Sequence, residues 1–76
     1  MNTIESIPVA NVPAGQRFRV LDTHVCGEYL GDVVYRASSN RRQVFIGDGA
    51  PAVLVIDTER CHSIPMASAR RVVVID

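Results

Sequence analysis

The run Ala52-Val53-Leu54-Val55-Ile56-Asp57-Thr58 (AVLVIDT) decides the fold class of this 76-residue chain. Four of its residues are Val, Leu or Ile in succession, and the branched Cβ atoms of Val and Ile fit a pleated strand better than a helix. The rest of the chain shares this preference, because Val and Ile together supply eighteen residues and Leu only three. The sequence therefore predicts an all-β fold, with one strand over residues 52–58.

Closer to the N-terminus, residues 16–23 alternate between polar and apolar side chains. Arg17 and Arg19 fall on one face and Phe18 on the other, as expected of a strand with one buried side. Further strands are predicted at residues 33–37, 43–47 and 70–76, with a hairpin loop at 38–42 (SSNRR). Wide turns or connections are predicted at residues 26–32 and 59–69, the latter because Pro65 is excluded from a central strand.

No window has the sustained three-to-four-residue apolar period of a helix, so the sequence predicts no long helix. A single turn near residues 66–69 (MASA) is the one helical alternative. Five short strands predict a strongly bent antiparallel sheet that closes as a small barrel of SH3-like or OB-like kind. A flat meander is the competing arrangement. We expect an N-terminal arm or edge strand at residues 1–11 and one domain over residues 12–76.

Residues 53–56 and 72–75 are apolar at every position, which is typical of strands covered on both faces. Without helices, that cover must come from the arm or from a second copy of the chain. An uncovered valine-rich edge would also promote aggregation. We therefore predict a homo-oligomer, most simply a two-fold dimer, or a complex with another protein. The predicted interface residues are Val53, Val55, Val72 and Val74.

Eight basic and eight acidic residues balance, so no net charge attracts the chain to nucleic acid or to anionic lipid. Every basic residue is Arg, whose planar guanidinium binds phosphate oxygens in pairs. A site for an anion or a nucleic-acid backbone is therefore the second hypothesis, and a solvated loop is its competitor. The arginines predicted to form this site are Arg17, Arg19, Arg36, Arg41 and Arg42.

The chain contains a near-repeat, VLDTHVC at residues 20–26 and VIDTERC at residues 55–61. Its candidate metal ligands are His24, Cys26, Cys61 and His62. Such a set suits zinc, but neither pair has the C-x₂-C spacing typical of closed zinc sites. We therefore predict no metal and no cofactor, with two reduced thiols in the core or in loops. A disulfide between the two cysteines is the alternative, and it requires an oxidising compartment.

The same repeat carries two Asp-Thr pairs, a pattern used by aspartic proteases, in which two carboxylates share one proton. Those enzymes require Gly after Asp-Thr, whereas this chain has His24 and Glu59 there. We predict instead that Asp and Thr end two strands by hydrogen bonding to nearby backbone groups.

No catalytic residue is predicted, and the chain is expected to be non-enzymatic. The alternative is an oligomeric enzyme with a pocket at a subunit interface, lined by Asp22, Asp57 or His24. The first fifteen residues have no basic segment followed by an apolar one, and no apolar run reaches membrane-spanning length. We therefore expect a soluble, cytoplasmic protein without membrane contact.

Three segments, VPAGQRF (12–18), VVYR (33–36) and the valine-rich end of the chain, carry a family resemblance. The chain resembles small proteins encoded on bacteriophages, plasmids and integron gene cassettes, many of which have no assigned function. The likeness covers most of the chain through a G-x-x-F motif and a Tyr/Arg strand. It implies a compact β-barrel or sheet and a prokaryotic mobile-element origin, and it carries over no catalytic residue. A plasmid dihydrofolate reductase is excluded, because its Val-Gln-Ile-Tyr pore strand has no counterpart beyond QVFIG (43–47).

Overall fold

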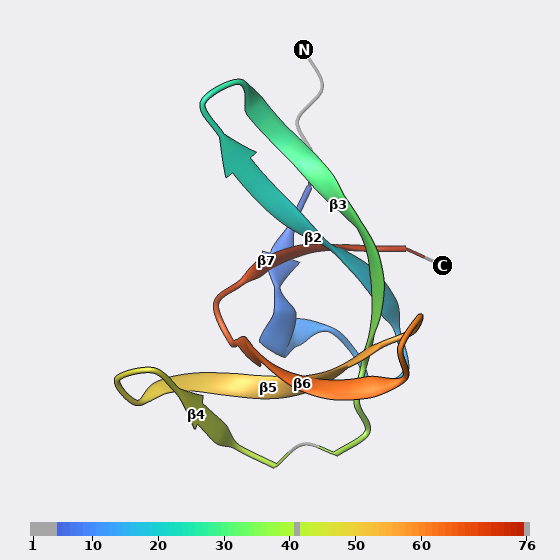
Figure 1. The fold of residues 1–76 in the computed structure, drawn as a ribbon, viewed down its shortest axis with the longest axis vertical. Helices are drawn as coiled ribbons and strands as arrows, with labels where there is room; N and C mark the ends of the chain where they lie inside the picture. The colour runs from blue at the N-terminus through green and yellow to red at the C-terminus, as the bar shows by residue number, and fades with distance from the viewer. Residues whose placement is uncertain (1–4, 41, 76) are drawn as a thin grey trace.

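The computed structural model describes residues 5–40 and 42–75, which form one curled antiparallel sheet (Figure 1). These residues contain no α-helix and one short 3₁₀ helix. The elements are β1 (Ile7–Pro8), η1 (Val9–Asn11), β2 (Arg17–His24), β3 (Gly27–Ala37), β4 (Val44–Ile46), β5 (Ala50–Asp57), β6 (His62–Ala67) and β7 (Arg71–Val74). The predicted all-β fold with a strongly bent, barrel-like sheet and no long helix is confirmed, but the described residues form seven strands rather than the predicted five.

The sheet is antiparallel and curls back on itself (Figure 1). Its strand order is β1-β7-β2-β3-β5-β4, and β6 pairs with the remaining side of β5. The last strand, β7, returns to pair with β2 through Arg19 opposite Val73 and Val20 opposite Val72. Because β6 pairs only with β5 among the described strands, the curl is a half-barrel with a gap beside β6 (Figure 1).

The core lies on the concave side of the sheet and is built around Phe18. This side chain is fully buried and its ring stacks on Tyr35, with centroids 5.8 Å apart. Val55 of β5 and Val72 of β7 are also fully buried in the same cluster. Burial of these residues fits the predicted alternation of residues 16–23, in which Phe18 faces inward.

The N-terminal arm covers the open end of this core. Val9 of η1 and Val12 just after it are buried in the same cluster as Phe18. The η1 segment lies inside the curl of the sheet (Figure 1). The Val9 amide donates to the carbonyl of Arg70 at 2.8 Å, which ties the arm to the β6–β7 turn. The arm therefore supplies much of the cover that the doubly apolar strands require.

The predicted hairpin between residues 33–37 and 43–47 is wrong. Tyr35 to Ala37 of β3 pair with Val55 to Asp57 of β5, and β4 pairs with the earlier half of β5 along the same edge. The connecting loop turns away from β3 through local hydrogen bonds. The Asn40 amide donates to Ser38 Oγ at 3.0 Å, and the Arg42 amide donates to Asn40 Oδ1 at 3.0 Å.

Residues 62–67, predicted as part of a connection, form β6, and no helical turn occupies 66–69. Pro65 lies opposite Leu54 in this strand. Proline has no backbone N–H to donate, and this is tolerated because β6 is an edge strand within the described part of the chain. β3 also begins at Gly27, six residues before the predicted strand start, so β2 and β3 form a long hairpin.

Candidate functional site

The outer half of the β2–β3 hairpin projects beyond the half-barrel (Figure 1). β7 pairs with β2 only at Phe18 to Val20, and β5 pairs with β3 only at Tyr35 to Ala37. The segment from Leu21 to Leu30 is therefore a two-stranded ribbon, and neither of its outer edges pairs with a described strand. We call this segment the hairpin arm.

The tip of the hairpin arm is apolar and exposed. Val25 in the turn is 96% exposed, and Tyr29 on β3 is 51% exposed. The Tyr29 ring meets the His24 ring edge-on, with centroids 6.3 Å apart. The Cys26 amide donates to His24 Nδ1 at 3.5 Å, which holds the imidazole against the turn. A shallow hollow of about 300 Å³ lies along these side chains. The arrangement presents an aromatic and an aliphatic side chain to a partner rather than a reactive group.

The four valines predicted as an interface do not share one surface. Val55 and Val72 are fully buried in the core, so they present no surface to a second chain. Val53 is partly buried against the core, and Val74 at the end of β7 is 42% exposed. The exposed apolar surface lies instead at the hairpin tip and at Phe45 of β4, which is 61% exposed. The predicted interface valines are not exposed together because η1 and the curl of the sheet cover the inner face of the sheet.

The two copies of the near-repeat have different roles. In the second copy β5 ends at Asp57, whose Oδ1 accepts from the Glu59 and Arg60 amides at 2.9 and 3.1 Å. Thr58 Oγ1 donates to the Val34 carbonyl at 2.7 Å. This copy ends a strand as predicted. In the first copy β2 ends at His24, one residue beyond the predicted end near Thr23, and Asp22 pairs with Arg70 rather than with nearby backbone amides.

The candidate zinc ligands lie in two separate turns. His24 and Cys26 lie at the tip of the hairpin arm, whereas Cys61 and His62 lie at the β5–β6 turn on the other side of the molecule (Figure 1). Among the described residues, no three His, Cys, Asp or Glu side chains are grouped to hold a metal ion. Both cysteines are exposed free thiols.

Cys61 adopts a left-handed backbone conformation, with φ of 57°, in the tight turn that joins β5 to β6. A side chain with Cβ costs about 1 kcal/mol or more in this conformation, whereas Gly adopts it freely. We predict that Cys61→Gly raises the free energy of unfolding by about 0.5 kcal/mol. Cys61→Val is expected to lower it by about 1–2 kcal/mol, since branched residues are most strained there.

Urea unfolding of the two variants beside the unchanged chain measures both effects. Each variant removes the same thiol, so loss of sulfur cannot explain a difference between them. Equal stabilities for Cys61→Gly and Cys61→Val would show that this turn does not hold residue 61 in the left-handed region.

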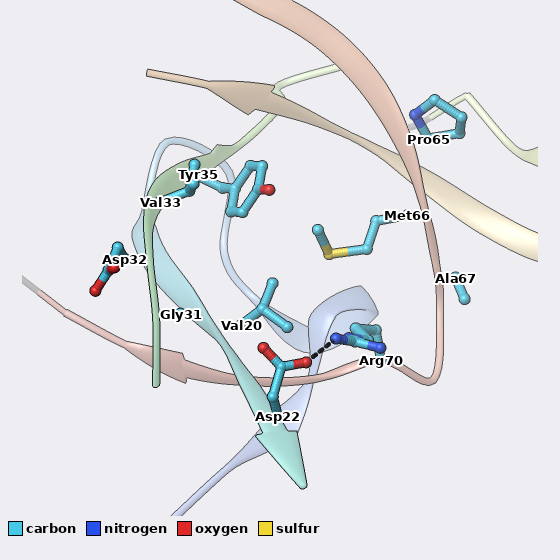
Figure 2. Close-up of a pocket in the computed structure, with 10 residues that line it drawn as sticks. All are labelled: Val20, Asp22, Gly31, Asp32, Val33, Tyr35, Pro65, Met66, Ala67 and Arg70. Atoms are coloured by element: carbon cyan, nitrogen blue, oxygen red, sulfur yellow. Dashed lines mark hydrogen bonds and ion pairs between the residues drawn. The ribbon is translucent and has the colours of Figure 1, made fainter. Parts of the chain in front are cut away.

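A pocket of about 430 Å³ opens at the gap of the half-barrel between β2, β3 and β6 (Figure 2). Asp22 of β2 and Arg70 of the β6–β7 turn form an ion pair at its rim. The Tyr35 ring and Met66 line its wall (Figure 2). Of the acids and His24 considered for an enzyme site, only Asp22 lies here, and Arg70 engages its carboxylate. The titratable residues that line the pocket are Asp22, Asp32, Tyr35 and Arg70.

Three of the five predicted anion-binding arginines share the outer, convex face of the sheet. Arg17 lies directly opposite Arg36 in the β2–β3 pair, and Arg19 follows on the same face of β2. Arg42 is exposed in the loop before β4, and Arg41 lies outside the described residues. Sequence reasoning missed Arg71, which alternates onto this face because the next residue, Val72, points into the core. Its sequence signal was the adjacent Arg70-Arg71 pair at a strand start.

Comparisons of the chain with protein-family models, curated protein sequences and solved structures gave no match. The resemblance to mobile-element proteins therefore stays a prediction. No helix in the described part of the chain is long and apolar enough to cross a membrane.

Proposed function

We propose that this protein is a non-enzymatic binding module that self-associates as a two-fold dimer through its hairpin arm. The observation that supports it best is the apolar tip carried on an otherwise uncovered ribbon. Val25 is almost fully exposed and Tyr29 is half exposed at a site that the rest of the described chain does not cover. An isolated two-stranded ribbon is marginally stable in water, so it gains from a further strand or packed surface.

A second copy of the chain can both cover the apolar tip of the hairpin arm and add a strand to its unpaired edge. Burying an aliphatic side chain such as Val25 contributes about 1.5–3 kcal/mol, and a Tyr ring contributes a larger area with a polar end. The unpaired backbone edges accept another strand by β-addition. In a two-fold contact the same surface serves both partners, so one apolar tip is enough to build it. Glu28 beside the tip sits at the rim, where its charge stays in water.

Sedimentation velocity of the purified protein tests this proposal. We predict a dimer for the unchanged chain and a monomer for Val25→Asp, because two carboxylates would meet at the buried tip. Val25 is 96% exposed in the single chain, so the variant is expected to keep its thermal unfolding midpoint as a monomer.

Phe45→Asp is the matched control, since it places the same charge on an exposed apolar residue of β4 away from the hairpin arm. It is expected to remain a dimer. A monomeric unchanged chain would contradict the proposal. Loss of the dimer in Phe45→Asp but not in Val25→Asp would move the interface to β4.

A further inference from the structure

The pocket at the gap of the half-barrel has an apolar body and a charged rim. Its volume of about 430 Å³ lies within the range of small-molecule sites, about 300–1,000 Å³. Val20, the Tyr35 ring and the Met66 thioether line its body (Figure 2). The Tyr35 ring is held by stacking on Phe18, so this wall is formed before any ligand enters. An apolar or aromatic group therefore finds a fitted surface between Tyr35 and Met66.

The rim offers one positive and one negative charge side by side. One terminal guanidinium nitrogen of Arg70 donates to Asp22 Oδ1. Asp22 Oδ2 and the other N–H groups of this guanidinium take no further hydrogen bond from the part of the chain that the structure describes. The side chains of Asp22 and Arg70 are 32% and 46% exposed, so a ligand can reach both. The ion pair therefore keeps an acceptor and several donors for a bound molecule.

Two residues of β3 influence which ligand charge suits this rim. A Cβ at Gly31 would stand 3.8 Å from Asp22 Oδ2, so glycine leaves the approach to this oxygen open. Asp32 also lines the pocket, but its carboxylate is directed away from Asp22 and Arg70 (Figure 2). Its negative charge nearby disfavours a ligand that carries only an anion, and Arg70 disfavours one that carries only a cation. A ligand with both charges gains from Asp22 and from Arg70.

The free edge of β6 beside the pocket does not suit an added peptide strand. The Ser68 amide, just after β6, donates to the Pro51 carbonyl, so even-numbered residues on this side direct their backbone groups toward β5. The alternation of an antiparallel pair then turns the backbone of Pro65 toward the free edge. Proline has no N–H to donate there, and proline on an edge hinders strand addition. The gap therefore suits a small molecule better than a strand.

We propose that this pocket binds a free amino acid with an apolar or aromatic side chain. The α-ammonium group donates to Asp22 Oδ2, and the α-carboxylate accepts from Arg70. The side chain of the ligand packs between Tyr35 and Met66. Both charges of the ligand are then paired at the rim, through charge-assisted hydrogen bonds that are stronger than neutral ones. Binding at this pocket does not depend on the hairpin tip or on dimer formation.

NMR titration with L-phenylalanine tests the proposal, with the isotopically labelled methyl group of Met66 as the reporter. The chain has two methionines, and Met66→Leu identifies the signal of Met66. The amino acid is added up to about 10 mM, tenfold above a dissociation constant of about 1 mM. We expect a saturable shift of the Met66 signal. N-acetyl-L-phenylalanine lacks the ammonium group and L-phenylalanine amide lacks the carboxylate, so each is expected to bind at least about tenfold more weakly.

Variants at the rim test the two charges from the side of the protein. Asp22→Asn and Arg70→Gln are each expected to weaken the binding of L-phenylalanine at least about tenfold. Both side chains are partly exposed, so the variants are expected to keep the fold. Gly31→Ala keeps both charges but places a methyl group near Asp22 Oδ2, and it is also expected to weaken binding.

Arg60→Gln is the matched control, because it removes the same charge from an exposed position in the β5–β6 turn. It is expected to bind like the unchanged chain, as is the Val25→Asp monomer. The two analogues probe the same charges on the unchanged chain, so the outcome does not depend on how the variants fold. An unshifted Met66 signal, equal binding of either analogue and L-phenylalanine, or equal losses in Arg60→Gln and Arg70→Gln would each overturn the proposal.

Discussion

Phe18→Ala is expected to lower the free energy of unfolding by about 3–5 kcal/mol. Phe18 is fully buried and stacked on Tyr35 at the centre of the concave face. Removing such a ring costs about 3–5 kcal/mol, through lost burial and the cavity left behind. A domain of 76 residues has a total stability of about 4–11 kcal/mol, so this single change removes a large share of it.

Circular dichroism during urea unfolding gives the free energies of unfolding for this comparison. Phe45→Ala is the control, because Phe45 is 61% exposed on β4 and its loss is expected to cost less than about 1 kcal/mol. Similar losses for the two phenylalanines would show that the core is not organised around Phe18.

Val55→Asp is expected to abolish folding. Val55 is fully buried on β5, and the cluster that surrounds it consists of apolar side chains. An uncompensated carboxylate there costs several kcal/mol, or forces the sheet to open so that water can reach it. The sequence alone placed Val55 at a subunit interface, where the same change would leave a folded monomer.

The outcome of Val55→Asp therefore shows whether Val55 lies in the core or at a subunit interface. Val25→Asp makes the same chemical change at a residue that is 96% exposed, and it is expected to give a folded monomer. Near-ultraviolet circular dichroism and sedimentation of both variants make the comparison. A folded, monomeric Val55→Asp would place Val55 at an interface and contradict its burial in the core.

Local sequence patterns predicted the strands that alternate clearly. Arg17, Phe18 and Arg19 alternate between the two faces, so the position and the inward side of β2 followed from two-residue periodicity. Strand pairing did not follow, because it depends on which segment occupies each edge. Residues 44–46 pair with β5 instead of β3 because Val55 to Asp57 already fill the β3 edge. Pro65 was correctly excluded from a central strand but is accommodated on an edge.

The sequence likewise predicted some features of the candidate sites and not others. Alternation predicted that Arg17 and Arg19 share a face, but only the cross-strand register brings Arg36 opposite Arg17. Runs that are apolar on both faces indicated that these strands must be covered, yet they did not show that Val9 of the arm and Val12 just after it provide the cover. Val25 lies in a turn where periodicity carries no information, so sequence patterns did not mark the hairpin tip.

Thiol cross-linking through Cys26 tests self-association at the hairpin tip most directly. Cys26 is exposed next to Val25, so a two-fold contact at the tip brings the two copies of this thiol close together. With a short bifunctional thiol reagent, we predict covalent dimers for the unchanged chain and for Cys61→Ser, and only monomers for Cys26→Ser. Cys61 is the internal control, since it is equally a free, exposed thiol but lies at the β5–β6 turn. Cross-linking that needs Cys61 rather than Cys26, or no covalent dimer from the unchanged chain, would contradict an interface at the hairpin arm.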